Sequence, residues 1–189
     1  NGEIYRGITA SAGEVGYTEI SARGINRGKF PILFQDQHRF GEILTTRNLE
    51  QSIQVAVSAN GRQTLLQNND ITLNSIASAA KRQDGLAMDA LTEFGQILGM
   101  LTISVINLFN PELIILGGPV IDKCPLVLEQ ATLNAKQDVL IVPVESVQIK
   151  AGALKNRAGT LGAVGMVLQD LFKPPIVNLA TYRSLILPE

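Results

Sequence analysis

Residues 106–119 read INLFNPELIILGGP, and this stretch decides the fold. Its first part continues a helical apolar pattern. Pro111 ends this helix, because a proline disfavours the helical conformation of the residue that precedes it. The run Leu113–Leu116 predicts a buried strand, and Gly117-Gly118-Pro119 closes that strand with a turn. A helix leading into such a strand, with another helix after it, is typical of an α/β fold with a parallel sheet.

The helix before this strand is predicted over residues 84–109. It carries an apolar stripe at spacings of three and four, formed by Leu91, Phe94, Leu98, Leu101, Val105 and Leu108. Its second half is apolar all round, so we expect that half to be buried centrally. The uncharged stretch Phe94–Pro111 approaches the length of a membrane span. Its polar residues and the lack of close basic flanks favour a buried helix of a soluble protein.

Downstream of this strand, helices are predicted over Pro125–Ala135 and Thr160–Phe172, with a strand between them over Val147–Lys150. Strand, helix and strand in this order predict a right-handed parallel unit. We expect residues 1–172 to form one folded region and residues 173–189 to form a C-terminal tail.

Shorter elements are predicted in the first half of the chain. Glu3–Ile8 and Val15–Ile20 are expected to be extended, which gives a hairpin-rich start. Residues 21–47 predict a loop with one short element near Ile32–Phe34. Asn48 and Thr72 are expected to cap helices, the second with Ile76, Ala77 and Ala80 on one face. Asn1-Gly2 is a hairpin turn signal whose first strand would precede residue 1, so we expect a fragment of a longer chain.

Charge and composition exclude several functional classes. Sixteen Lys and Arg against seventeen Asp and Glu give a net charge of −1, which offers no basis for direct nucleic-acid or anionic-membrane binding. One cysteine and one histidine exclude an internal disulfide and a metal site made only of Cys and His ligands. The near absence of cysteine fits a reducing compartment, and we expect the protein in the cytoplasm.

Two glycine-containing segments are candidate ligand sites. Gly13-Glu14-Val15-Gly16-Tyr17 places a carboxylate between two glycines, where it can approach a small polyol and accept hydrogen bonds from its hydroxyls. A bulged turn with an exposed Glu14 is the other interpretation. Gly117-Gly118-Pro119 follows the strand, where open α/β sheets bind ligands, although a plain tight turn has the same pattern.

Other reactive or phosphate-binding residue types do not form a recognisable site. Residues 24–30 fail as a phosphate loop, because the glycines are too close and Phe30 follows the lysine. His38 lies in a polar loop and is expected at the surface. Cys124 is expected to be an unreactive residue at the start of a helix, and we predict no catalytic residue in the chain.

Four sequence segments, in the same order along the chain, resemble motifs of the ROK family of repressors, open reading frames and kinases. They are residues 1–7 with 12–16, Ala79-Ala80 with Asp84 and Ala87, residues 106–118, and Ala158–Ala163. The resemblance implies an actin-like ATPase fold of the ribonuclease-H type, of which this chain is mostly the C-terminal lobe. The family's phosphate motifs and catalytic aspartate would lie upstream, so this fragment is not expected to transfer a phosphoryl group by itself.

Two departures from the family pattern affect the expected site. The family's E-x-G-H glutamate and histidine bind sugar hydroxyls, and that histidine also binds zinc. Glu14 is retained, but Tyr17 stands in the place of the histidine. The family's cysteine motif would fall within residues 21–47, which contain no cysteine, so the resemblance implies that zinc binding is lost. Phe40–Ile43 is a candidate remnant of the motif's "GCLE" end.

The resulting expectation is the effector-sensing and self-associating domain of a sugar-responsive transcriptional repressor. Glu14, Tyr17, Gly13 and Gly16 would form the sugar site, and Gly117, Gly118 and Pro119 would border the former nucleotide cleft. DNA would be bound only through an upstream domain, and we expect a homo-oligomer. One alternative is the C-terminal lobe of an ATP-dependent sugar kinase, with ATP as its cofactor. Another is a ligand-incompetent remnant that only dimerises.

Overall fold

The computed structural model describes residues 4–20, 31–33, 38–60, 63–67, 70–138 and 147–172. Contacts divide the chain into two units, Asn1–Lys155 and Asn156–Glu189. The helices and strands of the first unit are η1 (Val15–Tyr17), α1 (Phe40–Ile43), α2 (Thr46–Asn60), α3 (Leu73–Lys81), α4 (Gly85–Phe109), β1 (Leu113–Leu116), α5 (Pro119–Lys123), α6 (Pro125–Asp138) and β2 (Gln148–Ala151). The second unit carries α7 (Ala158–Leu171), which follows the short turn η4 (Lys155–Arg157).

Helix α4 is the central helix of the first unit, and its predicted bounds are confirmed. Asp84 caps its start by accepting a hydrogen bond from the Ala87 N–H at 3.0 Å. The helix ends at Asn110, which takes the left-handed conformation with φ 42°, immediately before Pro111. By length and composition alone α4 could cross a membrane. Its packing against α2, α3 and α6 instead identifies it as the core helix of this unit.

The apolar stripe predicted on α4 is correct in its first half and wrong in its second. Leu91 and Phe94 are buried, whereas Leu108 is 74% exposed. The buried line that runs into the second half starts at Gly95, before the middle of the helix, and continues through Gly99, Thr102 and Ile106. This line contains two glycines and a threonine, so a search for apolar periodicity does not detect it. The expectation of central burial also fails at the C-terminal end, where Phe109 is exposed.

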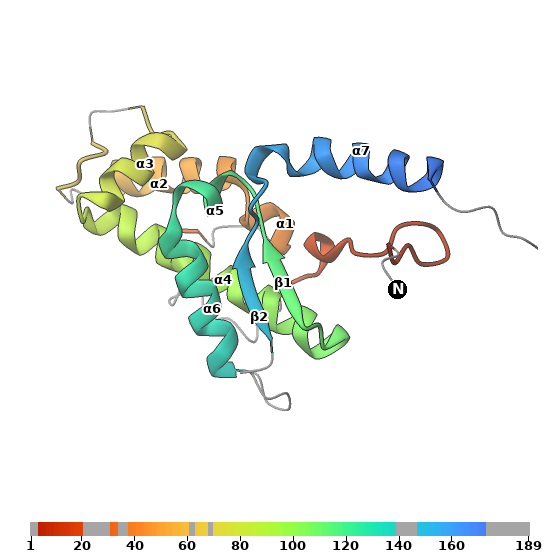
Figure 1. Ribbon diagram of the computed structural model, residues 1–189. Coiled ribbons are helices and arrows are strands. Elements are labelled where there is room, and N and C mark those ends of the chain that lie inside the picture. Colours follow the sequence, from red (N-terminus) through yellow and green to blue (C-terminus); the bar gives the residue numbers. More distant parts are fainter. Residues whose placement is uncertain are drawn as a thin grey trace, which may run out of the picture. The chain divides into compact units, whose positions relative to one another are not determined.

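The two glycines allow α4 and α6 to pack closely (Figure 1). A Cβ added at Gly95 would lie 2.8 Å from the Val127 carbonyl oxygen. A Cβ added at Gly99 would lie 2.9 Å from the carbonyl oxygen of Ala131. Both positions therefore require the absence of a side chain, because backbone atoms of α6 occupy the space.

Strands β1 and β2 form a parallel pair, which confirms the predicted strand–helix–strand unit. Ile114 pairs with Ile149, and both side chains pack on the small cluster that includes Ile106 of α4. The expectation that β1 is buried is correct only for this face. On the other face Leu113 is 44% and Ile115 is 63% exposed, because the described part of this unit does not cover it.

Several predictions for the first half need correction. Residues 4–8 form no strand, and Val15–Tyr17 is a 3-10 turn; in the described part of residues 4–20 only Glu19 pairs as a strand, through a single bridge to Arg39. An extended segment needs a neighbour for its backbone groups, and the described residues supply it only at that point. Within residues 21–47 the structure has a turn at 31–33 and the unpredicted helix α1.

The two capping predictions have different outcomes. Thr72 caps α3 by accepting a hydrogen bond from the Ser75 N–H, and Ile76 on that helix is fully buried. Asn48 does not cap α2, because this helix already begins at Thr46. The short helix α5 was not predicted separately from α6. The predicted tail, residues 173–189, lies outside the described residues, as do residues 21–30 and 34–37 of the predicted loop.

Candidate functional site

The segment around Glu14 is a tight turn whose backbone is fixed by its own hydrogen bonds. Gly13 has φ +94°, a conformation that L side chains rarely adopt, and its carbonyl accepts a hydrogen bond from the Val15 N–H at 2.7 Å. The Tyr17 N–H donates to the Glu14 carbonyl at 3.1 Å. Glu14 therefore stands at the start of η1 with an exposed side chain that makes no hydrogen bond within the described residues.

The turn packs directly on the start of α1 through two glycines. A Cβ added at Gly41 would lie 3.0 Å from the Gly16 carbonyl oxygen, so the two backbones are in contact. The Phe40 N–H donates to the Thr18 carbonyl at 3.2 Å and extends this contact. Gly16 is therefore in contact with the protein's own backbone at Gly41, and its place in a sugar site stays a prediction.

This contact places a cation against Tyr17. The Arg39 guanidinium carbon lies 5.7 Å from the centroid of the Tyr17 ring, within the range of a cation–π interaction. Glu42 lies one turn further along α1, and its carboxylate accepts hydrogen bonds from the backbone N–H groups of His38 and Arg39, both at 3.2 Å. The sequence analysis did not place Arg39 beside Tyr17, because only the contact between two distant glycines shows it.

Gly117, Gly118 and Pro119 form the turn between β1 and α5. Gly118 has φ +119°, which favours glycine. Among the described residues, no atom lies within 4 Å of a Cβ added at Gly117 or Gly118. The feature has the same geometry as a plain strand-to-helix turn, so its assignment to a nucleotide cleft stays a prediction.

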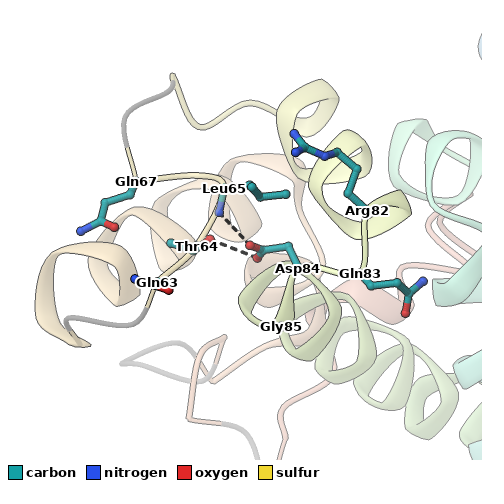
Figure 2. A pocket seen from close by; sticks show the side chains of 8 residues that line it. All are labelled: Gln63, Thr64, Leu65, Gln67, Arg82, Gln83, Asp84 and Gly85. Atoms are coloured by element: carbon teal, nitrogen blue, oxygen red, sulfur yellow. Dashed lines mark hydrogen bonds between the residues drawn. The ribbon is translucent and has the colours of Figure 1, made fainter.

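A polar hollow of about 540 Å³ lies between the loop at residues 63–67 and the start of α4 (Figure 2). Asp84 forms its floor, where its carboxylate accepts hydrogen bonds from the Thr64 hydroxyl at 3.0 Å, the Leu65 N–H at 2.8 Å and the Ala87 N–H. Burial alone would raise the pKa of Asp84, but these hydrogen bonds outweigh burial and hold its pKa below the usual value. Asp84 therefore ties the loop to the start of α4.

His38 was expected at the surface and Cys124 was expected to be unreactive, and both have environments that agree with these expectations. His38 is exposed. Cys124 is only 3% exposed, and burial raises its pKa to about 11 although Lys123 and Lys81 act in the opposite direction. A thiol with this pKa is protonated at neutral pH and is a poor nucleophile.

Zinc binding requires a cluster of His, Cys, Asp or Glu side chains. Within the described residues, no group of three or more His, Cys, Asp and Glu side chains could hold a metal ion. Tyr17 supplies a phenol where the family has an imidazole, and the phenol lies against an arginine. The described donor set does not fit zinc, and the positions of residues 21–30 and 34–37 lie outside the described part.

Comparisons with known proteins give the same family as the sequence motifs. The xylose repressor of Caldicellulosiruptor bescii is 27% identical over 176 residues, which are 92% of this chain and 43% of the repressor. The transcriptional regulator NagC of Escherichia coli is 28% identical over 140 residues, 72% of this chain and 32% of NagC. The chain thus spans less than half of the length of these relatives.

Among solved structures, the ROK family glucokinase of Streptomyces griseus, in complex with glucose and AMPPNP, matches 87% of this chain and 54% of the kinase. The TM-score is 0.71 at 22% sequence identity, so the similarity shows the shared fold. This match and the parallel strand–helix unit establish the α/β, actin-like ATPase fold class. Residues 1–170 match the ROK family, and the chain belongs to it.

Proposed function

We propose that this chain is the effector-sensing part of a sugar-responsive transcriptional regulator of the ROK family. The proposal is supported by similarity to the xylose repressor over 92% of the chain. At the residue level it rests on one observation: Glu14 presents a carboxylate with no partner in the described structure, between two glycines in a fixed turn. Such a carboxylate can accept hydrogen bonds from two neighbouring hydroxyls of a sugar.

In this proposal Tyr17 and Arg39 complete the sugar site. The Tyr17 ring is 68% exposed, and Arg39 covers part of it. The uncovered ring offers an apolar face for the C–H side of a sugar and a hydroxyl for one hydrogen bond. Gly117, Gly118 and Pro119 border the cleft that faces the other lobe.

The regulatory mechanism is a shift between two populations. A sugar that binds one arrangement of the lobes more tightly shifts the protein toward it and changes the affinity of a DNA-binding domain elsewhere in the full-length protein. The protein acts in the cytoplasm as a homo-oligomer and needs no zinc. ATP enters only in the alternative function, a sugar kinase, which the likeness in fold to a ROK glucokinase favours.

The test is thermal unfolding of the full-length protein with a panel of pentoses and hexoses. A sugar at a hundred times its Kd should stabilise the protein by about 2.7 kcal/mol. The same sugar should release the full-length protein from the DNA that it binds. Glu14→Ala should abolish both effects. Glu19→Ala is the matched control, because Glu19 is an exposed carboxylate in the same segment.

Three outcomes would contradict the proposal. ATP-dependent phosphorylation of the sugar would establish the kinase instead. Absence of a thermal shift with every sugar would favour the remnant that only dimerises. A full response in Glu14→Ala would remove Glu14 from the site.

A further inference from the structure

The turn at residues 31–33 enters the hydrophobic core although it belongs to a long connecting segment. Leu33 is fully buried and Ile32 is 9% exposed. Backbone N–H and C=O groups that leave water in this way must find other partners. Two side chains from distant helices supply them.

Glu93 of α4 accepts from the N–H groups of the turn. Its Oε2 atom lies 3.1 Å from the Ile32 nitrogen and 3.0 Å from the Leu33 nitrogen, and its Oε1 atom lies 3.3 Å from the Ile32 nitrogen. The Glu93 side chain is itself 93% buried, since the residue is 7% exposed. Burial raises the pKa of Glu93, the two backbone donors oppose the rise, and the charge of Asp89 adds to it.

Asn48 of α2 donates to the carbonyl groups. Its Nδ2 atom lies 3.4 Å from the Leu33 oxygen and 3.1 Å from the oxygen of Ile43, the last residue of α1. Asn48 is 5% exposed. It therefore joins the turn to the helix that carries Arg39 and Glu42 at its start.

We propose that Glu93 and Asn48 are positioning residues: together they form a metal-free clamp that fixes the turn at 31–33 and, through α1, the Arg39 side of the candidate sugar site. The part that concerns the sugar rests on the function proposed above. The clamp itself consists of hydrogen bonds between buried groups and does not depend on that function. It accounts for how residues 31–33 are held against the core.

The clamp predicts a selective effect on hydrogen exchange in the full-length protein. Replacing Glu93 by Leu removes the acceptor of both N–H groups, so exchange at Ile32 and Leu33 should accelerate about ten- to a hundred-fold. Amide protection in the α4–α6 core should stay unchanged. Glu93→Gln keeps one acceptor oxygen and should retain most of the protection, which separates a hydrogen-bonding role from space filling. Glu129→Gln, an exposed carboxylate on α6, is the control.

Two further measurements test the same hydrogen bonds. If Glu93→Leu does not fold, Asn48→Ala should accelerate exchange at the same two amides. EDTA should leave the wild-type protection unchanged, and loss of protection with EDTA would show that a metal holds the turn. Unchanged exchange in the variants that fold would overturn the clamp.

Sugar binding is measured in parallel. With a sugar that stabilises the wild type, Glu93→Leu, or Asn48→Ala in its place, should weaken binding about ten-fold or more although Glu14 is intact. Unchanged affinity would overturn the positioning role. If the wild type binds none of the sugars, the proposed function and the positioning role in sugar binding both fail, and the exchange data still decide whether the clamp exists.

Discussion

Asp84 illustrates how a single carboxylate can be structural although it lies in a polar hollow. Its oxygens accept hydrogen bonds from Thr64 and Leu65 (Figure 2). They also accept one from the Ala87 N–H, and so connect a loop to the start of the core helix. The resemblance to the ROK family indicates Asp84 only as one residue of a motif at the start of a helix. The structure adds the reason that an acidic residue is needed there.

Asp84→Ala should destabilise the protein by about 1–3 kcal/mol at neutral pH, because it leaves the Leu65 and Ala87 N–H groups without their acceptor. The folded-state pKa of Asp84 lies below its ordinary value. The ionised carboxylate therefore stabilises the folded state above about pH 4, and this stabilisation is lost as the pH falls through the folded-state pKa. Urea unfolding at pH 7 and pH 3 should therefore show that wild type and variant differ less in their free energy of unfolding at pH 3 than at pH 7. The exposed Asp70→Asn is the control, and an equal difference at both pH values would refute the assignment.

Only part of the candidate site could be predicted from the sequence. Glu14 and its flanking glycines stand together in the chain, so local pattern and family resemblance both indicate them. Arg39 meets Tyr17 only because Gly16 and Gly41 bring two backbones into contact. The local sequence around Glu93 does not indicate its role, since its partners are about sixty positions away. Contacts of this kind depend on tertiary packing and leave no local pattern.

At the scale of elements, α4 shows both the strength and the limit of periodicity. The pattern gives its length and bounds, because capping and apolar spacing are local properties. It gives the wrong face in the second half, because the contact with α6 is made by glycine and threonine. Strand β1 was placed correctly for the same local reasons, but how many of its faces are covered depends on what packs against the sheet.

Gly95→Ala should destabilise the first unit by about 1–3 kcal/mol, because the new methyl group would overlap the Val127 carbonyl oxygen and force the helices apart. This is the reverse of the effect of alanine on an isolated helix, where it is better than glycine by about 1 kcal/mol. Gly85→Ala is the matched control, since Gly85 is in the same helix and no described atom lies within 4 Å of its added Cβ. Thermal unfolding of both variants tests the packing, and an equal response of the two would contradict it.

For the whole molecule, the proposed function requires that sugar and DNA affect each other equally. If a sugar weakens DNA binding by a given factor, the DNA must weaken sugar binding by the same factor, typically about 5- to 150-fold. Titration of the full-length protein with sugar, in the presence and absence of saturating DNA, measures this factor directly. A sugar affinity that DNA does not change would show that Glu14 binds sugar without a regulatory consequence.

The fold class was predictable at this scale because the motifs occur in the family order along nearly the whole chain. The hairpin-rich start was not reproduced in residues 4–20, because strands depend on partners that the local sequence does not specify. The sequence indicates the function less directly than the fold, since ROK repressors and a ROK glucokinase both match this chain.

The protonated, buried thiol of Cys124 has a practical consequence for spectroscopy. It is the only cysteine in these 189 residues, and at 3% exposure maleimide reagents should leave it unmodified in the folded state. A cysteine introduced at an exposed position such as Glu19 would then be the single labelled position within this region. A fluorophore there, paired with one on a bound DNA duplex, would report the distance change on sugar binding in single molecules, without first removing the native cysteine.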